Sequence, residues 1–259
     1  VNSNMGGKAL IPYNSPVEAG NPQRMLTSFE NIGRVIPGFE LEVIANVYRT
    51  GRGSNTVYNL EIINLKNQER NQVLSGQNYL FGDIVFAKSA PRMAFYVQDI
   101  NDETNGLYVA DTENGEYVKT INKPNMLIYD ISPNGDKVLY TTNSGGSNTQ
   151  LYEYTVSTRS DRLISDRIKG SQYQYLDNEN ILFIELRDGS SNVYSLSTTL
   201  NETARLTNLS GLEGVEAVYQ QNGLILYQSN STIYALMPEY LNSNKVITRD
   251  FIRYTGYDF

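Results

Sequence analysis

The chain has 259 residues, a net charge of −7, no cysteine and no histidine. The acidic balance excludes a basic field for nucleic-acid phosphates or anionic lipid heads. The missing residue types exclude disulfides, thiolate metal sites, cysteine nucleophiles and a Ser-His-Asp triad within this chain. No stretch approaches 18 apolar residues, so no membrane-spanning segment is expected. We predict no catalytic residue, no metal ligand and no cofactor.

Two short apolar runs open the chain, at residues 9–13 and 24–27. They have the pattern of the third and fourth strands of a sheet that lacks its first two strands. Residues 1–30 are therefore expected to form half a blade. The start at Val1 also leaves room for an export signal or a lipid anchor removed upstream, which we treat as an expectation.

From residue 31 onward the sequence repeats with a period of about 44 residues, and periods of 20 to 50 indicate solenoids or propellers. Each repeat carries two apolar and aromatic anchors that predict its second and third strands. The first anchors are Val47-Tyr48, Phe95-Tyr96, Leu139-Tyr140, Phe183-Ile184 and Leu226-Tyr227. The second anchors are Val57-Tyr58, Leu107-Tyr108, Leu151-Tyr152, Val193-Tyr194 and Ile233-Tyr234.

Turn residues precede each first anchor, and a short run ending mostly in Ser or Thr follows each second anchor. Asn134-Gly135 and Asn222-Gly223 are the preferred pair for a two-residue hairpin with positive φ. The later runs predict fourth strands at Val73–Ser75, Lys119–Ile121, Leu163–Ser165, Arg205–Thr207 and Val246–Thr248. Four antiparallel strands per repeat predict an all-β fold, a β-propeller of four-stranded blades.

A single β-propeller domain over residues 1–259 is expected, because a ring protects the sheet edges that an open row exposes. We favour six blades, the last shared by both termini, since residues 251–254 predict a further first strand. Five blades with an N-terminal hairpin is the alternative. The expected divisions are a half-blade at 1–30, repeats at 31–78, 79–122, 123–168, 169–210 and 211–250, and a closing strand at 251–259.

The third repeat, from Ile131-Ser132-Pro133-Asn134-Gly135-Asp136-Lys137 through Leu151-Tyr152 to Arg162-Leu163-Ile164-Ser165, resembles the TolB-type propeller repeat. The fourth repeat is similar, with Arg187-Asp188-Gly189 before its second anchor. The resemblance implies the propeller fold first and a binding role second. A peptidase related to these propellers would need an α/β domain with Gly-x-Ser-x-Gly and a histidine. An oligogalacturonate lyase would need histidines around a metal.

Propellers usually gather binding groups on the face formed by the loops after the second and fourth strands. Eight polar residues follow the second strands, and two tyrosines lie on first strands near the expected channel. These candidate binding residues are Arg49, Arg52, Gln98, Asp99, Asn143, Arg187, Asp188, Gln228, Tyr129 and Tyr175. Plain solvation of the polar rim and core packing of the tyrosines are the other interpretations.

The sequence thus favours a non-enzymatic, exported propeller, either a lipoprotein or another periplasmic, envelope or extracellular protein. Its expected partner is a protein, a peptide or a glycan, and not nucleic acid. One alternative is a hydrolase or lyase that uses a pair of carboxylates on a polysaccharide. Another is a structural module of a larger assembly.

Overall fold

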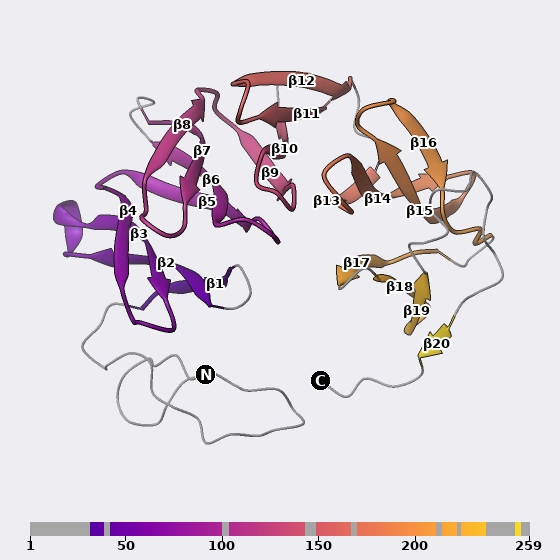
Figure 1. Ribbon diagram of the computed structural model, residues 1–259, viewed down its shortest axis with the longest axis horizontal. Coiled ribbons are helices and arrows are strands. Elements are labelled where there is room, and N and C mark those ends of the chain that lie inside the picture. The colour runs from indigo at the N-terminus through magenta and orange to yellow at the C-terminus, as the bar shows by residue number, and fades with distance from the viewer. Residues whose placement is uncertain are drawn as a thin grey trace. The chain divides into compact units, whose positions relative to one another are not determined.

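The computed structural model describes residues 32–38, 42–99, 104–142, 149–166, 170–210, 214–221, 224–236 and 252–254. The chain divides into two compact units, residues 1–128 and 129–259. Each unit is described by itself. Figure 1 labels the strands, which fall into five four-stranded antiparallel sheets.

The first two sheets are formed by residues 34–121. The strands of the first sheet are β1 (Arg34–Pro37), β2 (Val43–Thr50), β3 (Val57–Asn64) and β4 (Arg70–Gly76), with the short 3-10 helix η2 (Gly53–Asn55) between β2 and β3. Those of the second are β5 (Tyr79–Phe86), β6 (Arg92–Asp99), β7 (Gly106–Asp111) and β8 (Tyr117–Ile121). Within each sheet, every strand pairs antiparallel with the next strand in sequence.

The remaining three sheets follow the same order. The third contains β9 (Met126–Ile131), β10 (Lys137–Thr142), β11 (Gln150–Thr155) and β12 (Ser160–Ser165). The fourth contains β13 (Gly170–Tyr175), β14 (Asn180–Arg187), β15 (Ser190–Ser197) and β16 (Glu202–Arg205). The fifth contains β17 (Ala217–Gln221), β18 (Leu224–Ser229), β19 (Thr232–Leu236) and β20 (Ile252–Tyr254).

The two aromatic anchors of a repeat lie directly opposite each other on the second and third strands of four sheets. These cross-strand pairs are Phe95–Tyr108, Tyr140–Tyr152, Phe183–Tyr194 and Tyr227–Tyr234. Their rings stack with centroids 5.1 to 5.7 Å apart, an offset arrangement that adds about 0.5–1.5 kcal/mol beyond burial. The first sheet departs from this pattern, because Tyr48 faces Asn59 and Tyr58 faces Arg49.

Neighbouring sheets within each unit share apolar cores. Phe81, Phe95 and Tyr108 of the second sheet pack with Ala45 and Leu60 of the first. In the second unit, one such core joins the third and fourth sheets and another joins the fourth and fifth. We call these contact regions seams, and the seam between the third and fourth sheets is the one that matters below.

Glutamine side chains bridge the first strands of the fourth and fifth sheets, which belong to separate hydrogen-bonded sheets. The amide of Gln172 donates to the carbonyl of Glu216 at 3.0 Å and accepts from the N–H of Val218 at 3.1 Å. Gln220 donates in the reverse direction, to the carbonyl of Leu176 at 3.0 Å. These side chains thereby satisfy main-chain carbonyl and N–H groups at the boundary between the two sheets.

Three sheets carry a β-bulge between the third and fourth strands. The residues that have no cross-strand neighbour in the strand register are Val73 in the first sheet, Thr120 in the second and Ile164 in the third. A bulge changes the direction in which a side chain points. Val73 is 4% exposed and belongs to the core, whereas Ile164 is only partly buried against its core.

Three sequence predictions differ from the structure. The fourth strand of the fourth sheet is Glu202–Arg205, whereas the sequence predicts Arg205–Thr207. The loop between β9 and β10 spans five residues, and in it the N–H of Gly135 donates to the carbonyl of Ser132 at 2.8 Å. Of Asn134 and Gly135, only the glycine has positive φ, at 72°, so the two-residue hairpin was wrong. Ser132 Oγ accepts the N–H of Lys137 at 2.9 Å, which favours the longer loop.

The fourth strand of the fifth sheet is Ile252–Tyr254, which pairs with β19. The sequence instead predicts residues 246–248 for this strand and residues 251–254 for the start of a further blade. Residues 246–248 and the expected half-blade strands at 9–13 and 24–27 lie outside the described residues. The choice between five and six blades and the domain divisions therefore stay predictions.

An alkaline titration tests the packing of the second sheet. Burial, reinforced by Tyr79, Tyr117 and Asp99, raises the pKa of Tyr108 to about 12 from its ordinary value of 10.0. Because the folded pKa is the higher one, this stabilisation is complete below pH 10 and is lost as the pH rises toward 12. We expect the free energy of urea unfolding to fall over that range, and to fall less steeply in Tyr108→Phe. If the free energy of unfolding fell with pH equally steeply in Tyr108→Phe and in the exposed control Tyr219→Phe, the prediction would be wrong.

Candidate functional site

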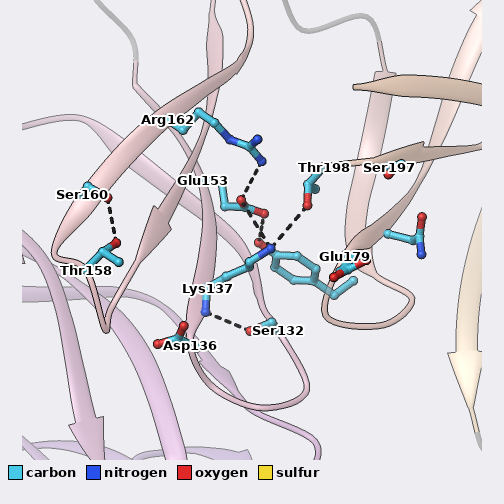
Figure 2. Close-up of polar contacts among 12 residues, drawn as sticks. Ser132, Asp136, Lys137, Glu153, Thr158, Ser160, Arg162, Glu179, Ser197 and Thr198 are labelled. Carbon is cyan, nitrogen blue, oxygen red and sulfur yellow. Dashed lines mark hydrogen bonds and ion pairs between the residues drawn. The ribbon is translucent and has the colours of Figure 1, made fainter. Parts of the chain in front are cut away.

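A buried carboxylate lies at one end of the seam between the third and fourth sheets (Figure 2). Glu153 on β11 is 2% exposed. Its Oε1 accepts a hydrogen bond from the Arg162 guanidinium at 2.9 Å and lies 3.7 Å from Lys137 Nζ. Lys137 Nζ also reaches Thr198 Oγ1 of the fourth sheet at 3.5 Å. Two cations thus compensate one buried anion, as burial of charge requires.

Tyr175 on β13 completes this cluster from the fourth sheet. Its hydroxyl donates to Glu153 Oε2 at 3.0 Å, and its N–H donates to Asp130 Oδ2 at 2.8 Å. Burial first, then the charge of Glu153, raises the pKa of Tyr175 well above its ordinary value. The hydroxyl therefore stays protonated and acts as a fixed donor that ties the two sheets together.

An open groove of about 520 Å³ lies along the same seam. The third sheet lines it with Leu151, Leu163, Ile164 and Ser165, followed by Asp166. The fourth sheet contributes Tyr173, Phe183, Glu185, Arg187, Leu196, Asn201 and Thr203. The volume falls in the range of ligand sites, and both apolar and polar side chains line the groove.

Arg187 and Glu185 form a bidentate ion pair in this groove. The Arg187 guanidinium donates to both oxygens of Glu185, at 3.0 and 3.1 Å, and this hydrogen bonding raises the pKa of Arg187. The carboxylate is buried, whereas the guanidinium is half-exposed. The guanidinium also lies 5.2 Å from the centre of the Tyr194 ring, a cation–π arrangement. Arg187 is thereby held in place with part of its surface open to a partner.

An aromatic row runs beneath Arg187. Tyr129 contacts Tyr173 edge-on at 5.2 Å, Tyr173 stacks on Phe183 at 5.0 Å, and Phe183 stacks on Tyr194. Tyr173 and Phe183 line the groove. Among the described residues, the Tyr194 hydroxyl is the buried side-chain polar atom that has no hydrogen-bond partner. The row gives the groove a rigid base.

The candidate residues of the second unit take different positions. Arg187 lines the groove, and Asp188 is exposed beside it in the turn that follows β14, with φ of 54°. Gln228 on β18 donates to Glu216 Oε2 at 2.9 Å, away from the groove lining. Tyr175 belongs to the seam core and Tyr129 packs against it. Asn143 lies outside the described residues.

The candidates of the first unit lie near the ends of second strands. Arg49 and Arg52 are exposed around the β2–η2 turn, and Gln98 is exposed on β6. Asp99 is buried instead, and Thr104 Oγ1 donates to its Oδ2 at 2.6 Å. These four residues stay candidates for binding.

Sequence reasoning missed most of the groove. Leu163 was assigned only to a strand, and Glu185 and Asp166 were not singled out. The alternation of Phe183, Glu185 and Arg187 along one strand is the signal that could have placed these side chains on one face. Ile164 had no such signal, because its direction depends on the bulge.

Within the described ranges, no group of three or more histidine, cysteine, aspartate or glutamate residues is arranged to hold a metal ion. No helix in those ranges has the length and apolar character that a membrane span requires.

Comparison with known proteins identifies the fold. No family model and no curated protein sequence matches the chain. Among solved structures, an oligogalacturonate lyase in complex with manganese has 11% identity and a TM-score of 0.54 over 76% of this chain and 61% of its own. An acylaminoacyl peptidase of Pyrococcus horikoshii has 13% identity and a TM-score of 0.62, covering 96% and 43%. A putative TolB of Agrobacterium tumefaciens has 11% identity and a TM-score of 0.51, covering 83% and 79%.

These similarities confirm the predicted fold class, a TolB-like β-propeller fold of four-stranded antiparallel blades. The chain spans less than two thirds of the lyase and of the peptidase. At such identities the similarity concerns the fold alone, and the activities of these proteins do not transfer with it.

A pair of Tyr→Phe variants tests the polar contacts of the seam. Tyr175→Phe removes a donor from the buried Glu153 carboxylate, so we expect a loss of about 1–3 kcal/mol in the free energy of unfolding. Tyr194→Phe removes a buried hydroxyl without a partner, so we expect no loss and a gain of up to about 1 kcal/mol. Urea unfolding measures both. Equal destabilisation by the two variants would show that this assignment of hydrogen bonds is wrong.

Proposed function

We propose that this chain is a non-catalytic binding module that holds a protein, peptide or glycan partner. Its polar surface groups, with Arg187 at the groove of the third and fourth sheets, supply the contacts. We further propose that the protein is exported to the periplasm, the cell envelope or the extracellular space, in keeping with its similarity to TolB-type propellers.

The observation that carries this proposal is the state of the buried carboxylates. Glu61 is paired with Arg70 and accepts the Asn46 amide at 2.6 Å. Glu153 and Glu185 have the cationic partners described above, and Asp99 accepts from Thr104. A general acid must hold a proton at neutral pH and a general base must be able to take one. Carboxylates engaged in this way serve the fold instead.

A carboxylate-based hydrolase or lyase would need a different arrangement. Two carboxyl groups, about 5 to 10 Å from each other, would have to flank the bond to be cleaved and be in different protonation states. In the groove, Glu185 is occupied by Arg187. This pairing favours recognition over turnover, because the Arg187 guanidinium already engages both carboxylate oxygens of Glu185.

Charge reversal tests the proposed binding residues. We expect Arg187→Glu to weaken binding of a partner found on a glycan array or captured from the source cell by about tenfold or more, since a central arginine is a typical hot spot. Arg49→Glu with Arg52→Glu probes the other proposed contacts. Lys66→Glu, on the exposed turn between β3 and β4, is the control.

Retained binding in the Arg187, Arg49 and Arg52 variants would count against these proposed contacts. Conversion of a polysaccharide into products by the native chain would overturn the non-catalytic role. Circular dichroism of each variant checks that the fold is intact.

A further inference from the structure

We propose that the groove and the outer edge of β12, the end strand of the third sheet, together bind an extended polypeptide segment that carries an apolar residue and, two positions away, a lysine or arginine. This inference rests on the proposed binding function and names the partner class for one site.

The first observation is an available sheet edge. Within the described residues, β12 pairs only with β11 and forms the end of the third sheet. Residues 160–163 of this strand are exposed. An unpaired strand edge presents main-chain N–H and C=O groups that an added strand can bind. The end of β12 also lines the groove, so an added strand would lie along the groove opening.

The second observation is apolar surface at this edge. Leu163 is 46% exposed, although it lines the groove with Ile164. The bulge between Leu151 and Tyr152 leaves Ile164 without a cross-strand partner, so two consecutive apolar residues of β12 reach the groove. Phe183 and Leu196 line it from the fourth sheet. A leucine-sized side chain entering here would bury surface that the fold leaves partly uncovered.

The third observation is uncompensated charge. Glu185 and Arg187 neutralise each other. Asp166 lines the same groove, is exposed, and forms no ion pair with any residue the structure describes. The groove lining therefore has a net negative charge, on a chain of net charge −7. A cationic side chain complements this end of the groove and is steered toward it.

The spacing of the partner's residues follows from strand geometry. Asp166 lies three residues after Leu163, but the bulge at Ile164 takes up one of these positions, because Leu163 and Ser165 face the consecutive residues Tyr152 and Leu151 of β11. Leu163 and Asp166 are therefore two register positions apart. Alternate residues of an extended strand lie on the same side, about 7 Å apart. An apolar residue opposite Leu163 thus places the residue two positions away near Asp166. Either order is allowed, according to the direction of the added strand.

An oriented peptide library tests the inference. The probe is a set of synthetic ten-residue peptides with a central leucine and either lysine or glutamate two positions before or after it. We expect the full chain to select lysine over glutamate at one of these positions. Fluorescence polarisation then gives the affinity of a selected peptide, its glutamate counterpart and versions N-methylated at alternate amides. One alternate set of methyl groups should abolish binding, because strand addition uses every second amide.

Three variants locate the site. Leu163→Asp should weaken the affinity for the selected peptide by about tenfold or more, whereas Leu127→Asp should leave that affinity unchanged. Leu127 on β9 is the matched control, because its exposure of 45% is nearly that of Leu163. Asp166→Lys should reverse the preference from lysine to glutamate. Both mutated groove residues are exposed, and unfolding curves verify that the variants are folded.

The outcomes separate this inference from the proposed function. No selection for lysine, or equal binding by native chain and Leu163→Asp, overturns the peptide site. If a glycan or another protein surface is bound instead and Arg187→Glu abolishes that binding, the peptide inference fails and the binding function stands. Turnover of a polysaccharide would overturn the binding function itself.

Discussion

Stacked aromatic pairs between the second and third strands are the contact on which the other features depend. In the second, fourth and fifth sheets the pair packs in the seam with the preceding sheet. Because the two rings lie opposite each other, a shift of one residue would turn one ring to the other face of the sheet. The pairs therefore specify strand register, and register decides which polar residues enter a seam. Glu153, Glu185 and Arg187 owe their positions to this constraint.

The seam between the third and fourth sheets combines a closed end and an open one. At the closed end Glu153, Lys137, Arg162 and Tyr175 satisfy one another, which links the sheets but leaves little chemistry to perform. At the open end the bulge at Ile164 and the exposed Leu163 leave a groove. A groove with a rigid aromatic base and a fixed guanidinium requires little reordering on binding, which favours recognition.

The sequence predicted much of this fold because its strongest signals are local or periodic. The anchors identified the second and third strands of all five sheets, and Leu163–Ser165 fell within β12. Features that depend on distant contacts could not be predicted in this way. Tyr175 was proposed for binding, but its hydroxyl is engaged by Glu153, 22 residues away. The groove depends on Ile164, whose direction follows from a bulge, and on Glu185, whose partner the sequence pattern does not specify. The end of the fifth sheet was misassigned because several short runs there have similar strand character.

Hydrogen–deuterium exchange of the chain with and without a bound partner tests the central claim most directly. If the groove is the binding site, protection on binding will be concentrated in β12, in the end of β14 near Arg187 and in the turn before β16. Protection confined to other segments, such as the turn around Arg52, would contradict the assignment of binding to this seam.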